Sequence, residues 1–184
     1  TRATALRSLA FWTISGPFAL ALPAQVGFLV HLVSILEPNL GRSDAGVAIS
    51  VMSVMAVVGR VGLGTIIDRL NQRIVTAVAL ASQAIALLVV MNSAEVTVLF
   101  VAVAVFGLSV GNLITLPALI VQREFPSNSF GPVIALSTAI NQFTYALGPA
   151  LMGAVRDLSG GYTAVLAICM AAELLDALKP QPDR

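Results

Sequence analysis

The stretch GRVGLGTIIDRLNQR, residues 59–73, decides the fold. It begins in an apolar run with three glycines, passes through a short charged turn, and enters a second apolar run at Ile74. Small residues let neighbouring membrane helices approach closely, and charges collect where such helices leave the bilayer. The stretch therefore predicts two membrane helices joined by a tight polar turn.

The composition of the whole chain agrees with this prediction. Of the 184 residues, 58% are hydrophobic and 10% are charged, whereas an ordinary soluble domain has about 25% charged residues. The formal net charge is only +1, so nucleic acid is not an expected partner. Cys169 is the single cysteine, which excludes a disulfide or a cysteine-based metal site within the chain.

Working outward from residues 59–73, six apolar segments can be separated by short polar breaks. They are approximately residues 8–36, 45–67, 74–91, 96–121, 131–155 and 162–178. Membrane strands would alternate apolar and polar residues over about ten positions, whereas these segments are apolar on all faces and longer. The predicted fold class is all-α, a polytopic six-helix membrane bundle whose partner is the lipid bilayer.

The basic residues predict the orientation of this bundle. One side holds Arg2, Arg7, Arg69, Arg73, Arg123, Lys179 and Arg184, and the other side holds Arg42 and Arg156. Lys and Arg accumulate in short cytoplasmic loops of membrane proteins. We therefore expect a multi-pass protein of an inner or plasma membrane, with both ends of this chain in the cytoplasm.

Prolines suggest how the six segments are related. Pro17 and Pro23 lie in the first segment and Pro117 lies in the fourth. These are matching positions in two groups of three helices, which is the pattern of an inverted three-plus-three repeat. No residue-level repeat accompanies it.

The charged turn combines residue types that suit a helix end. Asp68 can accept from free backbone N–H groups or from an arginine, and Arg69 complements the dipole at the end of a helix. Gly64 allows a neighbouring backbone to approach. A simpler interpretation is that any short cytoplasmic hairpin carries such charges.

The spacing Gly64-x-x-x-Asp68-Arg69-x-x-x-Arg73 resembles the signature loop of the major facilitator superfamily, which recurs between the second and third helix of each six-helix half. That motif usually has glycine where this chain has Asn71, which tolerates the same left-handed backbone region. GPALMG at 148–153 and DLSGGY at 157–162 also resemble the penultimate helix and following turn of such transporters.

The resemblance implies that residues 1–184 form the C-terminal half of a twelve-helix carrier. Its partner would be an N-terminal six-helix half. From the start at Thr1 rather than Met, with no signal-peptide pattern at the front, we expect these residues to be a piece of a longer chain. In the family, the acid of the motif helps to close the cytoplasmic side against the other half. Gly64, Asp68, Arg69 and Arg73 are therefore the expected gating residues.

Arg60 is the main candidate for contact with a substrate. It precedes Asp68 by eight positions, or about 12 Å along a helix, where an arginine costs about 2.5–3.5 kcal/mol unless it is compensated. A guanidinium can bind a carboxylate through two parallel hydrogen bonds. The alternative is a snorkelling or structurally paired arginine.

Arg60-x-x-x-Gly64 resembles the second-half helix of the monocarboxylate and oxalate–formate branch, where the matching arginine contacts the substrate carboxylate. Oxalate–formate members also use a lysine in the fifth helix, and 131–155 contains no basic residue. The resemblance therefore implies an organic monoanion in preference to a dicarboxylate.

Other polar residues within the segments complete the candidate binding site. Asn112 lies on a polar stripe of the fourth segment, and Asn141 and Tyr145 lie on a stripe of the fifth. Such stripes line cavities or join helices, and both interpretations stay open. His31 could titrate during transport or bond to a neighbouring helix.

Two further patterns bear on chemistry. Gly107-x-Ser109-x-Gly111 matches a nucleophile motif, but it lies inside an apolar helix and fits a Gly-x-x-x-Gly packing face better. Glu173 and Asp176 lie near the cytoplasmic end of the last segment. We therefore expect no buried carboxylate for proton coupling in this half.

The combined prediction is a secondary active carrier that transports a small organic anion by alternating access, with no enzymatic activity, cofactor or metal. The alternative is a membrane-embedded enzyme or a non-transporting scaffold. Either alternative could use the same bundle.

Overall fold

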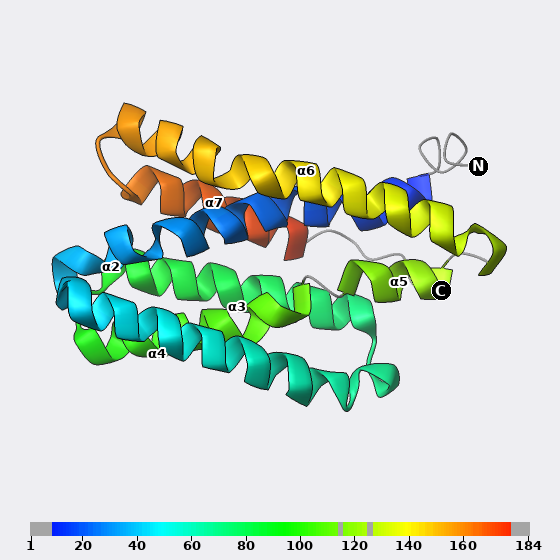
Figure 1. Ribbon diagram of the computed structural model, residues 1–184, viewed down its shortest axis with the longest axis horizontal. Coiled ribbons are helices and arrows are strands. Elements are labelled where there is room, and N and C mark those ends of the chain that lie inside the picture. The colour runs from blue at the N-terminus through cyan, green and yellow to red at the C-terminus, as the bar shows by residue number, and fades with distance from the viewer. Residues whose placement is uncertain (1–8, 114–115, 125–126, 178–184) are drawn as a thin grey trace.

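A computed structural model describes residues 9–113, 116–124 and 127–177. Within these ranges the regular elements are all helical, and the long helices run along the length of the molecule (Figure 1). The elements are α2 (Leu9–Gly64), η1 (Ile67–Arg69), α3 (Gln72–Asn92), α4 (Val96–Leu113), α5 (Leu116–Glu124), α6 (Ser127–Ser159) and α7 (Thr163–Ala177). The predicted all-α class is confirmed.

Helix α2 is divided at Gly41, whose φ of 76° and ψ of 163° are not helical. Glycine adopts a positive φ without steric cost, so the chain can reverse at one residue. Figure 1 shows the part after Gly41 running back along the molecule. We call residues 9–40 the first arm and residues 42–64 the second arm. The chain reverses within the predicted polar break, 37–44, but the break is not an eight-residue loop, because helix continues up to Gly41 on both sides.

Three of the described helical stretches are long and apolar enough to cross a membrane. They are Phe18–Gly64, Gln72–Asn92 and Val96–Gln122. The first has 47 residues, or about 70 Å of helix, against a hydrocarbon core of about 30 Å. With its reversal at Gly41, it accounts for the first two predicted segments.

The remaining segments differ from prediction mainly at their ends. The fourth, predicted as 96–121, is described as α4 and α5 on either side of residues 114–115, which lie outside the described part. The fifth, α6, extends past both predicted ends to 33 residues and contains Pro132 and Pro149. The sixth, α7, is a shorter apolar helix of 15 residues.

Asn71 has a different role from the one expected. Its φ of −72° and ψ of 108° are extended, and its side chain accepts a hydrogen bond from the N–H of Arg73. Asn71 therefore does not use the left-handed region that asparagine tolerates. The residue is instead the N-cap of α3, a position that asparagine favours because its side-chain oxygen satisfies a free N–H.

The helices pack in four main pairs. The first arm of α2 packs on α6, the second arm packs on α4, and α3 packs on both α7 and α4. Glycines make the closest crossings. A Cβ atom at Gly148 would meet the backbone of Pro23, and one at Gly107 would lie 2.5 Å from the carbonyl oxygen of Met52. The predicted packing face at Gly107 and Gly111 is confirmed, because both glycines lie against the second arm.

Candidate functional site

Arg60 lies where the second arm crosses α4. Its Nε donates a hydrogen bond of 3.1 Å to the carbonyl oxygen of Gly111. Gly111 itself packs against the backbone of Ala56 in the second arm. Arg60 therefore ties the second arm to α4.

This hydrogen bond leaves most N–H donors of the guanidinium available. Arginine carries five N–H donors, and the bond to Gly111 uses the one on Nε. Among the described residues no second bond of Arg60 occurs, and the residue is exposed on the surface of the bundle. The structural and the ligand-binding interpretations of Arg60 are thus compatible. The bond to Gly111 orients the guanidinium, and its remaining N–H donors can bind an anion.

The two asparagines of the predicted site are both buried. Asn112 follows Gly111, whose carbonyl accepts from Arg60. The Nδ2 of Asn112 donates to the carbonyl oxygen of Leu108 in the same helix at 3.0 Å. Asn141 belongs to α6, and its Oδ1 is buried without a hydrogen-bond partner. Asn112 is thus next to the Arg60 contact in sequence, whereas Asn141 belongs to the pair formed by α6 and the first arm.

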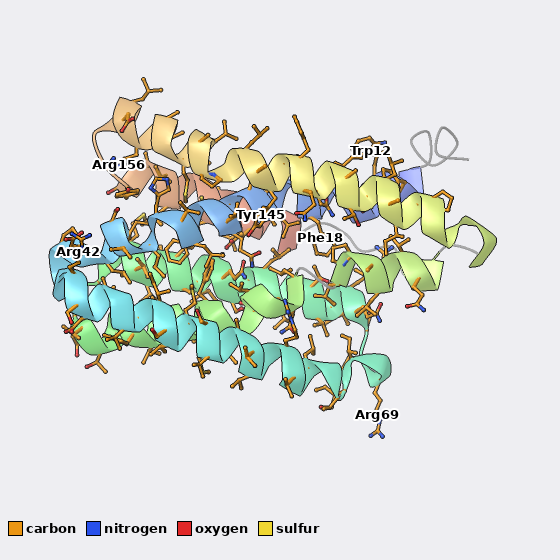
Figure 2. All side chains as sticks on the ribbon, in the orientation of Figure 1. Trp12, Phe18, Arg42, Arg69, Tyr145 and Arg156 are labelled. Carbon is orange, nitrogen blue, oxygen red and sulfur yellow. The ribbon has the colours of Figure 1, made fainter. Side chains whose placement is uncertain are left out.

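Tyr145 is half-buried and packs against an apolar cluster that includes Leu113 and Leu116. Figure 2 places Tyr145 near the middle of the length of the bundle. Within the described part of the chain its hydroxyl makes no hydrogen bond. A direct role in binding stays a prediction for Tyr145, as it does for the two asparagines.

His31 lies in a separate network. One ring nitrogen, Nδ1, is 3.0 Å from the hydroxyl of Tyr162, and the other, Nε2, is 3.3 Å from the carbonyl oxygen of Pro149. His31 lies ten residues before the reversal at Gly41, and Arg60 lies nineteen residues after Gly41. The two side chains therefore differ in depth by about 13 Å at about 1.5 Å per residue. The structure does not bring His31 together with Arg60.

This network joins the first arm to the turn between α6 and α7. The guanidinium carbon of Arg156 lies 5.1 Å from the centre of the Tyr162 ring, which adds a cation–π contact. Because the Pro149 carbonyl only accepts, Nε2 carries the proton, and Nδ1 of a neutral ring accepts from Tyr162. The geometry fits the packing interpretation of His31.

We expect Tyr162→Phe to lower the stability of the protein slightly. The change removes the bond to Nδ1, and one such bond contributes about 1 kcal/mol. For a chain of this size that is a drop of about 2–4 °C in melting temperature. Tyr145→Phe is the matched control and should leave the melting temperature unchanged. Equal melting temperatures for both variants would show that the bond has no structural role.

The predicted gating residues lie at the opposite end of the molecule from Gly41. Arg69 is exposed and extends away from the bundle (Figure 2), while Arg73 is partly buried at the start of α3. The side chain of Asp68 lies outside the described part. No described atom comes within 4 Å of a Cβ built on Gly64, whereas Gly59 lies directly against Leu108. The close approach expected at Gly64 is therefore made at Gly59 in this chain.

Sequence reasoning did not predict the burial of several polar side chains, among them Gln25, Gln83 and Glu173. Gln25 and Gln83 are almost fully buried, and neither amide has a hydrogen-bond partner. Glu173 is fully buried in α7, so the expectation that no carboxylate lies within the bundle is wrong. The sequence signal was one polar residue among apolar neighbours, and its position near the end of a segment concealed its burial. Among the described residues no group of three or more His, Cys, Asp or Glu could hold a metal ion.

Comparison with known proteins adds no assignment to this geometry. No family model matches the chain, and no curated protein matches it.

Proposed function

We propose that this chain is a six-helix half of a secondary transporter of the major facilitator type, which carries a small organic monoanion across a membrane by alternating access. Both ends of the chain lie in the cytoplasm in this proposal, because the basic residues gather on that side. The helices long and apolar enough to cross a membrane support it.

The helix pairing supports the inverted repeat. We number the helices one to six, taking the two arms of α2, then α3, then α4 with α5, then α6 and α7. A two-fold axis would exchange helix one with helix four, helix two with helix five, and helix three with helix six. It would then convert the pair of helices one and five into the pair of helices four and two. These are the first arm with α6 and the second arm with α4, and both pack closely through glycines. The pair three–six, α3 with α7, maps onto itself.

The single observation that carries the anion specificity is the geometry of Arg60. Its Nε is held by the carbonyl oxygen of Gly111 in α4, and the residue is exposed on the described bundle. An arginine at this depth is costly unless it meets a partner or a wet cavity. A carboxylate that docks on the free edge of the fork would supply that partner.

Uptake by the full-length protein in proteoliposomes tests this proposal. The probes are radiolabelled formate, acetate, lactate and oxalate. We expect saturable uptake of at least one monocarboxylate and weaker uptake of oxalate, since one guanidinium pairs one carboxylate. Residues 1–184 alone should give none, because the partner of the gate is missing. Failure of the full-length protein to transport any solute would favour a membrane enzyme or a scaffold.

A further inference from the structure

A cavity of about 290 Å³ lies between the first arm of α2, α6 and α7. Pro23 and Ala24 of the first arm, Gly148 and Met152 of α6, and Cys169 of α7 are part of its wall. Helix α7 packs mainly on α3 and touches α6 only slightly. The cavity is therefore the space that side chains leave unfilled between α6 and α7.

The wall of this cavity is almost entirely apolar. Thr144 is the one hydroxyl side chain in it, and that hydroxyl already bonds to the carbonyls of Ile140 and Asn141 in its own helix. A polar ligand would lose its bonds to water here and gain none in return. The chemistry of the wall selects a hydrocarbon.

The mouth of the cavity opens on the outer surface of the described bundle. Leu20, Leu151 and Ile168 line it and are 46%, 58% and 56% exposed. Cys169 lies near the middle of α7, so the cavity lies away from the helix ends that reach the headgroups. In a bilayer, the molecules present at this depth are acyl chains.

We propose that this cavity binds one acyl chain of a membrane lipid, which enters sideways between α6 and α7 while its headgroup stays outside. The proposal requires only that these helices lie in a membrane and does not depend on transport. The acyl chain replaces the missing contacts between α6 and α7, next to the crossing of Gly148 and Pro23. Bound lipid therefore holds α7 in place against the first arm.

Photo-crosslinking of the full-length protein tests this proposal. The protein is reconstituted with a phosphatidylcholine that carries a diazirine in the middle of one acyl chain, illuminated, and mapped by mass spectrometry. We expect labels on Val165 and Cys169, which are 2% and 4% exposed and so are out of reach of lipid at the surface. Exposed Val101 on α4 reports the labelling by bulk lipid.

Ala172→Phe and Ala171→Phe form a matched pair. Ala172 lines the cavity, whereas its neighbour Ala171 is exposed and does not. Ala172→Phe should lose the labels on Val165 and Cys169 and keep the label on Val101, while Ala171→Phe should keep all three. Ala172→Leu, a smaller change, should reduce the same two labels if the phenylalanine variant does not fold.

Two results would overturn the acyl-chain site. One is the absence of label on Val165 and Cys169 in the unmodified protein, which would mean that another protein segment or nothing fills the cavity. The other is equal labelling of these residues in Ala172→Phe and Ala171→Phe, which would mean that the lipid reaches them by another route.

Discussion

Arg60→Gln should abolish uptake of the monocarboxylate probes, and Arg60→Lys should reduce uptake at least about tenfold. A hydrogen bond to a charged group contributes about 1.5–3 kcal/mol, and each 1.4 kcal/mol is a factor of about ten in affinity. Lysine keeps the positive charge but lacks the planar guanidinium. It therefore cannot donate to the Gly111 carbonyl and at the same time bind a carboxylate with two parallel bonds. Initial rates over a range of probe concentrations measure the effect.

Arg42→Lys is the matched control. Arg42 is an exposed arginine next to Gly41, at the far end of the second arm, so this variant should transport at the rate of the unmodified protein. Equal amounts of folded protein in the liposomes have to be shown for each variant. Unchanged uptake by Arg60→Lys would exclude the guanidinium as the anion contact. It would leave Arg60 only the structural role of its bond to Gly111.

Gly148→Ala and Gly107→Ala should each destabilise the bundle. A Cβ at Gly148 would overlap the backbone of Pro23, and one at Gly107 would lie 2.5 Å from the carbonyl oxygen and 3.1 Å from the Cα of Met52. Backbone atoms cannot rotate away as a side chain can, so the helices must separate. Overpacking of this kind costs about 1–3 kcal/mol or more. Thermal unfolding in detergent measures the loss.

Two other glycines of the same helix pairs serve as controls. Gly153 of α6 and Gly62 of the second arm have no described atom within 4 Å of a built Cβ. Gly153→Ala and Gly62→Ala should therefore match or exceed the stability of the unmodified protein, since alanine favours helix by up to about 1 kcal/mol. If all four alanine variants melt alike, glycine contacts do not determine how the two helix pairs pack.

Much of the fold follows from the sequence, because long apolar segments leave the backbone no partner but itself. The Gly-x-x-x-Gly face of α4 was also predictable, since small residues at that spacing favour close packing. A reversal within residues 37–44 was also predictable, but its tightness was not. Glu37, Pro38 and Asn39 resemble a loop by composition, yet a single positive φ at Gly41 is enough to turn the chain, and the helix persists around it.

The candidate site was predictable in part. Arg60 is conspicuous as a charge within an apolar helix, but its bond to Gly111 depends on the crossing of two distant segments. His31 was grouped with Arg60 by chemical type alone, and the fold places it in a different network. The burial of Glu173 depends on which face of α7 meets α3, which a helix that is apolar all round does not reveal.

Access to position 60 tests the central claim most directly. Arg60→Cys is made in a protein whose other cysteines, Cys169 included, are replaced, and a membrane-impermeant maleimide is added from one side of the bilayer and then from the other. Alternating access predicts that position 60 reacts from both sides. Reaction from one side only would contradict the account.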